Sequence, residues 1–206
     1  MQKIGIMGGT FNPIHNGHLM IAENAREQFG LDKVLFIPTG HSPQKHKQHI
    51  TESFHRCNMV SLAIADNQWF ILDKTEVNST EISYTSLTLQ KLKEDYDESE
   101  LYFILGADSL FDFESWYEPE LILQNCTILA AYRKHERQEE FFQKIESLNK
   151  KYPEKFFPLD TLNMELSSQD IRNRLQSGQS VRYLIPKDVE SYIREQHLYE
   201  RGETGT

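Results

Sequence analysis

Short apolar runs alternate along this chain with longer stretches in which apolar residues recur at helical spacing. After the first run, a helix is predicted to begin near His18, because apolar positions repeat there every three or four residues as far as Gly30, a suitable left-handed cap. Alternating strands and helices indicate parallel β-α-β units, so we expect an α/β, doubly wound, mostly parallel sheet with helices on both faces. The predicted strands are residues 4–7, 34–37, 69–72, 101–105 and 127–131.

The carboxyl-terminal part of the chain has a different pattern. From about Asp160 onward, the pattern predicts a short helix beginning at Ser168 and a final helix opening at Pro186, a favourable residue for a first turn. We interpret residues 1–206 as one domain in which residues 160–206 form a small helical portion.

The junction between the first strand and its helix has the composition of a phosphate site. Gly8 and Gly9 allow close approach of backbone to an anion, and Thr10 adds a hydroxyl donor. The helix that follows offers unpaired N–H groups and a partial positive charge. His15 and His18 flank Gly17 near that helix start, where both imidazoles can donate to one anion. Zinc is the alternative, but catalytic zinc usually takes three protein ligands and no third is placed nearby.

A second cationic segment lies at 41–49, after the second predicted strand and before a helix that opens near Thr51. It contains His41, Lys45, His46, Lys47 and His49, in a chain whose formal net charge is −9. That charge argues against broad binding of nucleic acid or of a membrane surface, so an anionic ligand needs a local basic island. A solvated polar loop and a three-histidine metal site are the alternatives for this segment.

Three of the predicted strands run into segments that carry chemistry. These segments are 8–10, the basic segment 41–49 and 106–108. Because ligands of parallel sheets bind beyond the carboxyl ends of the strands, we expect the three to converge on one rim. A second phosphate candidate lies farther on, where Ser167 and Ser168 begin a helix and Arg172 lies one turn along; plain capping with an exposed arginine is the alternative.

Composition adds limits. No apolar run is long enough for a membrane span and no secretory signal is evident, so we expect a cytoplasmic protein, with a homo-oligomer left open. Cys57 and Cys126 lack metal-type spacing and are expected to be buried thiols.

At this point the motifs resemble a known family. Residues 8–18, Gly-Gly-Thr-Phe-Asn-Pro-Ile-His-Asn-Gly-His, resemble the G-G-T-F-D-P-I-H-x-G-H signature of the H-x-G-H nucleotidyltransferases, in particular the bacterial nicotinate-nucleotide adenylyltransferases. Further matching elements are Lys45 for P-P-H-K, 83–85 for S-Y-T, 106–108 for G-A-D, 116–117 for W-Y and 166–172 for I-S-S-T-x-x-R. Asn12, Gln44 and Gln169 depart from the family pattern.

The resemblance implies a Rossmann-like nucleotidyltransferase fold and adenylyl transfer from ATP to nicotinate mononucleotide, with Mg²⁺ travelling on ATP and no dedicated metal site. The residues it implies for catalysis are His15, His18, Lys45 and Arg172. Those implied for ATP binding are Gly8, Gly9, Thr10, Phe11, His18, Gly106, Ser167, Ser168 and Arg172. Those implied for the mononucleotide are Lys45, Tyr84, Thr85, Asp108, Trp116 and Arg133.

Several alternatives remain open from the sequence. The acceptor can instead be nicotinamide mononucleotide or phosphopantetheine, although the phosphopantetheine enzymes lack the S-Y-T and W-Y elements. Cytidylyltransferases share H-x-G-H but carry a different carboxyl-terminal signature. A non-catalytic nucleotide-binding module would keep the phosphate contacts without turnover.

Overall fold

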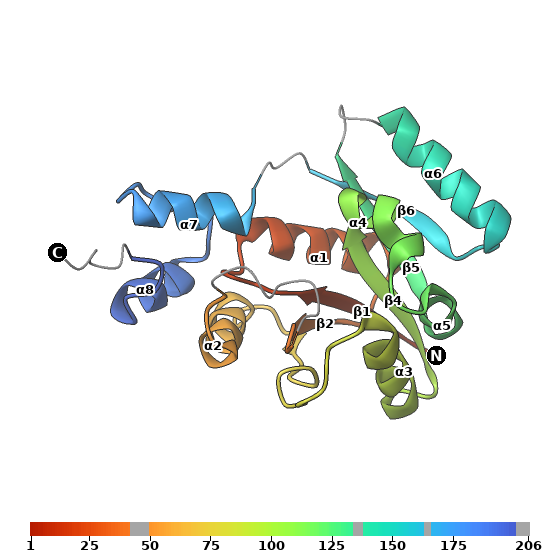
Figure 1. The fold of residues 1–206 in the computed structure, drawn as a ribbon, viewed down its shortest axis with the longest axis horizontal. Helices are drawn as coiled ribbons and strands as arrows, with labels where there is room; N and C mark the ends of the chain where they lie inside the picture. The colour runs from red at the N-terminus through yellow and green to blue at the C-terminus, as the bar shows by residue number, and fades with distance from the viewer. Residues whose placement is uncertain (42–49, 134–137, 163–165, 201–206) are drawn as a thin grey trace.

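The structure, a computed structural model, describes residues 1–41, 50–133, 138–162 and 166–200. Its centre is a six-stranded sheet in the order β3-β2-β1-β4-β5-β6, in which every neighbouring pair is parallel (Figure 1). The strands are β1 (Gln2–Gly9), β2 (Lys33–Pro38), β3 (Phe70–Leu72), β4 (Ser99–Gly106), β5 (Thr127–Arg133) and β6 (Phe156–Thr161).

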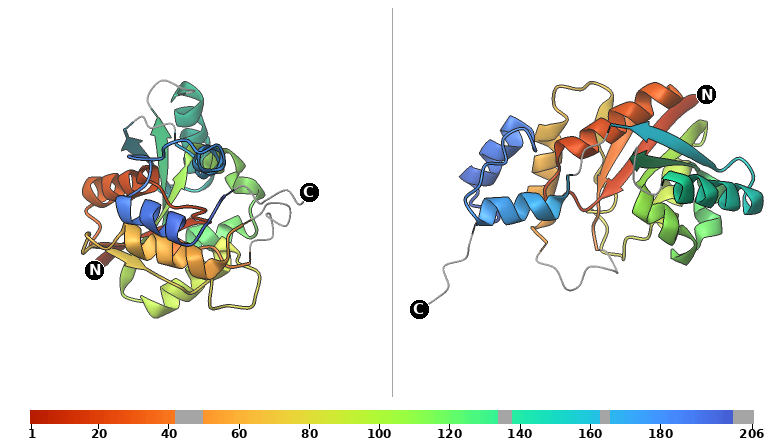
Figure 2. Two further views of the ribbon diagram at one scale, coloured as in Figure 1. Left: turned by 90° about the vertical axis from the view of Figure 1, so that its left-hand side faces the viewer. Right: turned by 90° about the horizontal axis from the view of Figure 1, so that it is seen from above.

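Helices cover both faces of the sheet, as the alternating pattern predicts (Figure 2). The helices α1 and α2 pack on one face, and α3, α4, α5 and α6 pack on the other. The helical segments are α1 (Asn16–Phe29), α2 (Ser53–Ala63), α3 (Thr85–Asp95), α4 (Ala107–Asp112), the 3-10 turn η1 (Phe113–Ser115), α5 (Pro119–Asn125), α6 (Gln138–Lys151), α7 (Ser168–Gln176) and α8 (Lys187–Glu195).

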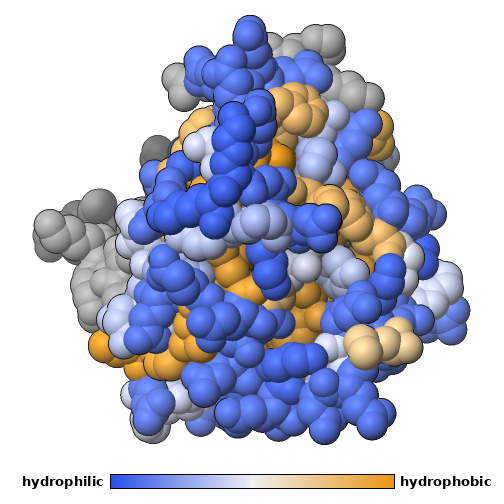
Figure 3. All heavy atoms as spheres, turned by 90° about the vertical axis from the view of Figure 1, so that its right-hand side faces the viewer, coloured by the Kyte–Doolittle hydropathy of each residue, from blue (hydrophilic) through white to orange (hydrophobic). Residues whose placement is uncertain are grey.

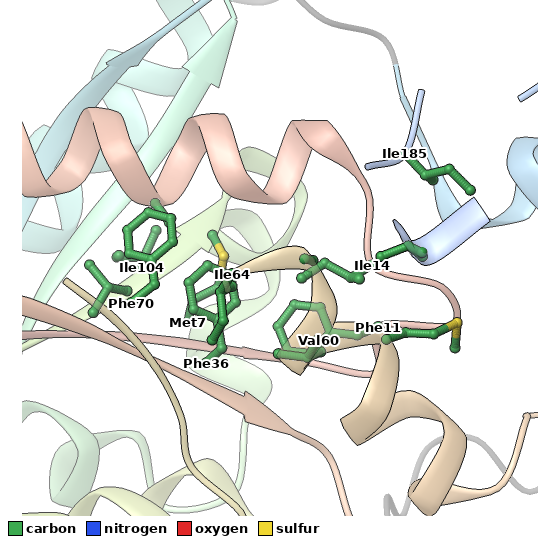
Figure 4. Packing of buried hydrophobic residues seen from close by; sticks show 14 of the residues in the cluster. Met7, Phe11, Ile14, Phe36, Val60, Ile64, Phe70, Ile104 and Ile185 are labelled. Atoms are coloured by element: carbon green, nitrogen blue, oxygen red, sulfur yellow. The ribbon is translucent and has the colours of Figure 1, made fainter. Parts of the chain in front are cut away.

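Alternate residues of each central strand supply the two cores. Met7 and Phe36 point into the core beneath α1 and α2, whereas Ile6 and Leu35 point into the core beneath α3 to α6. The first core continues through Ile14 to Ile185, and thereby joins the carboxyl-terminal helices to the sheet (Figure 4). The end of the molecule near α5 and α6 is mostly hydrophilic, with smaller apolar areas (Figure 3). None of the helices in the described ranges has the length and apolar character that a membrane span requires.

The five predicted strands are confirmed, but the sixth strand was not predicted. β6 contains Pro158 and Asp160, residues that usually argue against a strand. Both residues are tolerated because β6 is an edge strand, whose outer side needs no ladder partner. The side-chain amide of Gln28 donates to the carbonyl of Asp160 and accepts from its N–H, at 2.6 and 3.1 Å. β6 thus overlaps the start of the portion predicted as helical from about Asp160, and the first helix of that portion begins at Ser168, as predicted.

Helix boundaries differ from the predictions by a few residues. The first helix begins at Asn16 with His15 as its cap, so His18 is the third helical residue. The helix predicted near Thr51 begins at Ser53, and the final helix begins at Lys187 with Pro186 as its cap. Gly30 adopts the predicted left-handed conformation, with φ of 63°. Cys57 and Cys126 are free and buried, as predicted.

Sheet order sets the position of the site. β1 pairs with β2 on one side and with β4 on the other. The chain therefore adds strands outward from β1 in one direction as far as β3, and then in the opposite direction from β4 to β6. At such a switch point, the loops that leave the carboxyl ends diverge and open a crevice. The glycine motif follows β1 and therefore lies at this crevice.

Candidate active site

A cavity of about 800 Å³ opens at the carboxyl ends of the central strands. One side is formed by Gly8, Gly9 and Thr10, which end β1 and begin its loop. The opposite side brings together Tyr84 and Thr85 at the start of α3 with Trp116 and Tyr117, which follow η1. The fold thus places a glycine-rich backbone segment and an aromatic pocket around one space.

Arg56 holds the loops beside this cavity in place. It lies in α2, the residue is 3% exposed, and its guanidinium donates to three backbone carbonyls. The acceptors are Thr51, Thr10 and Thr39, at 2.9, 2.8 and 2.8 Å. One planar cation therefore ties together the ends of β1 and β2 and the segment before α2. Burial lowers the pKa of Arg56 from its usual value, although not enough to discharge a guanidinium.

The two histidines of the motif form a stacked pair. Their ring centroids lie 3.6 Å apart with 21° between the planes, and the rings of His18 and Phe11 form a T-shaped contact with 5.1 Å between centroids. His18 Nδ1 accepts the backbone N–H of His15 at 3.2 Å, which leaves the proton of a neutral His18 on Nε2. Burial, and then the proximity of His15, lower the pKa of His18 well below 6.5. His18 is therefore neutral near pH 7 in the free protein.

The start of α7 docks against the glycine-motif loop. Ser168 Oγ donates to the carbonyl of Pro13 at 2.8 Å, and Arg172 Nη1 donates to the carbonyl of Asn12 at 2.7 Å. Arg172 also donates to the amide oxygen of Gln169. Ser167 caps the helix by accepting the N–H of Asp170 at 3.1 Å. The two candidate phosphate segments thus meet, although Ser167, Ser168 and Arg172 all make internal contacts in this state.

Aromatic residues shape the other end of the cavity. The Trp116 ring packs against Phe103 and Phe113, with centroids 6.1 and 5.7 Å away. The rings of Tyr84, at the start of α3, and Tyr117, after η1, contact each other with centroids 4.2 Å apart and planes tilted by 30°. Tyr117 is 49% exposed, so this pair lies near the mouth of the cavity.

Glu76 is a half-buried carboxylate in the wall of the cavity that the sequence analysis did not identify. It accepts the Thr88 hydroxyl at 2.9 Å and the N–H of Gly40 at 3.4 Å. Burial raises its pKa above the usual range, and hydrogen bonds from Thr88 and Gly40 oppose that shift. A Cβ on Gly40 would lie 2.2 Å from the Glu76 carbonyl oxygen, so this close approach requires glycine. Glu76 thereby joins the end of β2 to α3.

The remaining predicted site residues are more dispersed. Phe11 has a φ of 48°, and its side chain is buried in the core, where it supports the loop. Gly106 ends β4, and Asp108 is exposed in the first turn of α4. Lys45 and the departure at Gln44 lie outside the described residues, as does the side chain of Arg133.

Arg56, Glu76 and Tyr117 were missed as site-forming residues for different reasons. Arg56 and Glu76 act through contacts far apart in the sequence, and no local motif signals these contacts. Tyr117 belongs to the W-Y pair, so the sequence motif did point to it, but the prediction gave a role only to Trp116.

The described residues contain no group of three His, Cys, Asp or Glu side chains that could hold a metal ion. The polar groups that line the cavity are mainly hydroxyls and backbone groups, with the carboxylates of Glu76 and Glu118 as the acidic members, so the lining does not offer a cluster of ligands for a bare cation. This donor set fits a metal that arrives already bound to a polyphosphate.

Comparisons with known proteins agree with this geometry. A sequence model described as Cytidylyltransferase-like matches residues 6–174. A relative from Lachnoclostridium phytofermentans, named probable nicotinate-nucleotide adenylyltransferase, is 42% identical over 199 residues, which cover 97% of this chain and 100% of the relative. A relative of the same name from Desulfitobacterium hafniense is 42% identical over 202 residues, which cover 96% of each chain.

A solved structure shares the fold. The nicotinic acid mononucleotide adenylyltransferase of Plasmodium falciparum, complexed with NaAD, superposes with a TM-score of 0.79 at 23% identity and covers 97% of this chain and 98% of its own. The likeness identifies the same six-stranded α/β architecture.

Proposed function

This chain belongs to the Cytidylyltransferase-like family, and from that premise we propose that it transfers the adenylyl group of ATP to nicotinate mononucleotide. The products are nicotinate adenine dinucleotide and pyrophosphate, so the enzyme serves NAD biosynthesis. The full-length relatives named for this activity, at 42% identity, support the choice of acceptor.

The chemistry requires alignment more than activation. A phosphate oxygen of the mononucleotide attacks the α-phosphorus of ATP, the new O–P bond forms, and the bond from the α-phosphorus to the bridging oxygen breaks. Pyrophosphate leaves with that oxygen. The attacking group is already an anion near pH 7, so no protein nucleophile is needed. The protein must bring two anions together and stabilise charge on the pentavalent centre.

We assign the α-phosphate to the glycine segment and the histidine pair. Gly8, Gly9 and Thr10 give the phosphate a backbone surface without side-chain obstruction, and His18 Nε2–H supplies a donor. A neutral imidazole still donates one hydrogen bond, and a bound phosphate favours its protonation. His15 stacks on His18 and fixes its ring plane.

The β- and γ-phosphates are assigned to the start of α7. Ser167, Ser168 and Arg172 lie where this helix meets the glycine-motif loop. Their donors would leave the internal acceptors and bind the phosphates instead. Lys45 is proposed to contact phosphate from the basic segment, and Gly106 to border the nucleotide. In this proposal residues 1–206 act as one domain, in which the helices after β6 complete the ATP site.

The aromatic pocket is assigned to the acceptor. Trp116 presents a ring for stacking on the pyridine, and the backbone around Tyr84 and Thr85 shapes the ring pocket. Asp108 is proposed to accept from a ribose hydroxyl, and Arg133 to contact the mononucleotide. A ring carboxylate prefers N–H donors, which favours nicotinate over the neutral amide. Mg²⁺ is proposed to enter with ATP, held by phosphate oxygens and water.

One observation carries the assignment more than any other. The cavity joins a side-chain-free glycine segment at the end of β1 directly to a pocket built from Tyr84, Trp116 and Tyr117. A polyphosphate and an aromatic base on a second nucleotide need this combination of surfaces in one space.

The test is pyrophosphate release by the purified protein with MgATP. Nicotinate mononucleotide, nicotinamide mononucleotide and phosphopantetheine are compared in parallel, and the dinucleotide product is identified by mass. We expect a strong preference for the first acceptor. Release with another acceptor would retain the phosphate assignment and overturn the acceptor pocket. Tight MgATP binding without turnover on any acceptor would indicate a nucleotide-binding module.

A further inference from the structure

Asn12 is the point where distant segments meet the phosphate loop. Its side chain is buried, and its Oδ1 accepts the Tyr199 hydroxyl at 2.8 Å and the Thr51 N–H at 3.3 Å. Its backbone carbonyl accepts Arg172 Nη1 at 2.7 Å. The residue thus contacts α7, the segment before α2 and the segment after α8.

Two guanidinium groups flank this point. Arg172 contacts Asn12 directly, and Arg56 contacts the carbonyls of Thr10 and Thr51 on either side. In the part of the chain that the structure describes, the contacts of both groups are to carbonyl and amide oxygens and not to carboxylates. Within these ranges neither guanidinium is paired directly with a carboxylate, and Glu76 acts on Arg56 only at longer range.

Tyr199 and Thr51, which both donate to Asn12 Oδ1, carry no charge. Burial raises the pKa of Tyr199 to about 12, so its hydroxyl donates as a neutral group at physiological pH. Arg172 and Arg56 lower the same pKa, so both cations lie close enough to act on the hydroxyl. Thr51 adds no charge. The formal charge of the cluster is thus that of its two arginines.

We propose that Asn12 sets the electrostatic strength of the polyphosphate site: its neutral amide makes the loop contacts while leaving the charge of Arg56 and Arg172 available to the ligand. A carboxylate at position 12, which the resembling motif carries, would accept from Tyr199 and Thr51 equally well. It would also place a negative charge between the two cations. Asn12 is a positioning residue: it holds the loop contacts, and it also affects the affinity of the site for anions. That the anion is a polyphosphate rests on the proposed function.

The magnitude follows from Coulomb's law at short range. A unit charge a few ångströms from a partly buried cation interacts with it strongly because the local dielectric constant is well below that of water, and part of this interaction is lost to water and salt. We therefore expect Asn12→Asp to weaken binding of polyphosphate roughly tenfold. Binding of the mononucleotide, whose proposed pocket lies at the aromatic end, should change less than threefold by the same argument.

The experiment measures binding directly, without turnover. Inorganic pyrophosphate and MgATP are titrated calorimetrically into the full-length protein and into Asn12→Asp, at low and moderate salt. Gln143→Glu, on the exposed face of α6, is the matched control because it makes the same one-unit change in net charge away from the cavity. Weaker binding of both ligands by Asn12→Asp alone, with the difference shrinking at higher salt, supports the proposal. Equal binding by the two variants overturns it.

Two further variants keep the test decisive. If Asn12→Asp does not fold, Thr51→Asp delivers the charge to the same cluster from a less buried position. It should weaken pyrophosphate binding in the same direction, and unchanged binding would overturn the proposal. In a double-mutant cycle, the effect of Asn12→Asp should shrink when Arg172 is replaced by Gln. Additive effects would contradict the shared electrostatic origin.

These outcomes are separate from the acceptor assignment. Pyrophosphate and MgATP binding does not depend on which acceptor the enzyme uses. Failure to turn over nicotinate mononucleotide would leave the binding result interpretable, and an unchanged binding constant would leave the proposed reaction intact.

Discussion

The imidazole rings of His15 and His18 stack 3.6 Å apart at the first turn of α1, and His18 Nδ1 accepts the backbone N–H of His15. Two protonated rings at this separation would repel each other, so double protonation is disfavoured in the free protein. A bound phosphate would offset that repulsion. His18 is therefore neutral at rest, and positive charge on its ring is best accommodated when the ligand is present.

His18→Ala should lower turnover far more than stability. Loss of one donor to a charged transition state costs roughly 10²–10³ in kcat. The contact between His18 and the helix cap is worth about 1 kcal/mol, so the protein should remain folded. Steady-state kinetics and thermal unfolding check this, with the exposed His197→Ala as control. Near-normal turnover by His18→Ala would show that the assigned role is wrong.

Stability should depend on the protonation of His18. Its pKa is lowered in the folded state, whereas in the unfolded chain it titrates near 6.5. As the pH falls below about 6.5, the unfolded chain takes up a proton that the folded protein does not, so the free energy of unfolding decreases. Urea unfolding at pH 7.5 and 5.5 measures the difference. His18→Gln, which can still cap the helix, should lose less stability over this interval, and equal losses would contradict the assignment.

Arg56→Lys should destabilise the protein although it conserves charge. An ammonium group cannot reproduce the planar arrangement of donors that reaches Thr10, Thr39 and Thr51, so at least one buried carbonyl loses its partner. We expect the free energy of unfolding to fall by about 2–4 kcal/mol. Arg194→Lys, on an exposed ion pair, should change it by less than about 1 kcal/mol. Similar values for the two variants in chemical denaturation would argue against the three-carbonyl clamp.

Trp116→Ala should affect the acceptor selectively. Removal of the ring eliminates the proposed stacking surface, worth about 1–2 kcal/mol, so KM for nicotinate mononucleotide should rise roughly five- to thirtyfold. KM for ATP should change much less. Trp69→Ala is the control, because Trp69 packs over Arg26 just before β3, near the amino end of that strand. An equal rise in both KM values would indicate a general loss of structure.

Local patterns predicted much of this molecule. Five strands and the glycine-to-helix junction were predictable because burial and helix capping act over a few residues. The convergence of segments 8–10 and 106–108 on one rim was also predictable, because parallel strands place their carboxyl ends together. β6 was not, since Pro158 and Asp160 are tolerated only at the sheet edge and with Gln28 beside them.

The sequence by itself therefore determined the alternating architecture, the glycine-histidine motif and the order in which chemical groups follow the strands. Only the tertiary structure decided that Arg56 joins three loops, that Glu76 braces Gly40, and that Tyr199 reaches Asn12 across 187 positions. The physical reason is the range of the interactions. Periodicity and capping depend on neighbours in the chain, whereas buried hydrogen bonds are satisfied by whichever residues the packed core brings within reach.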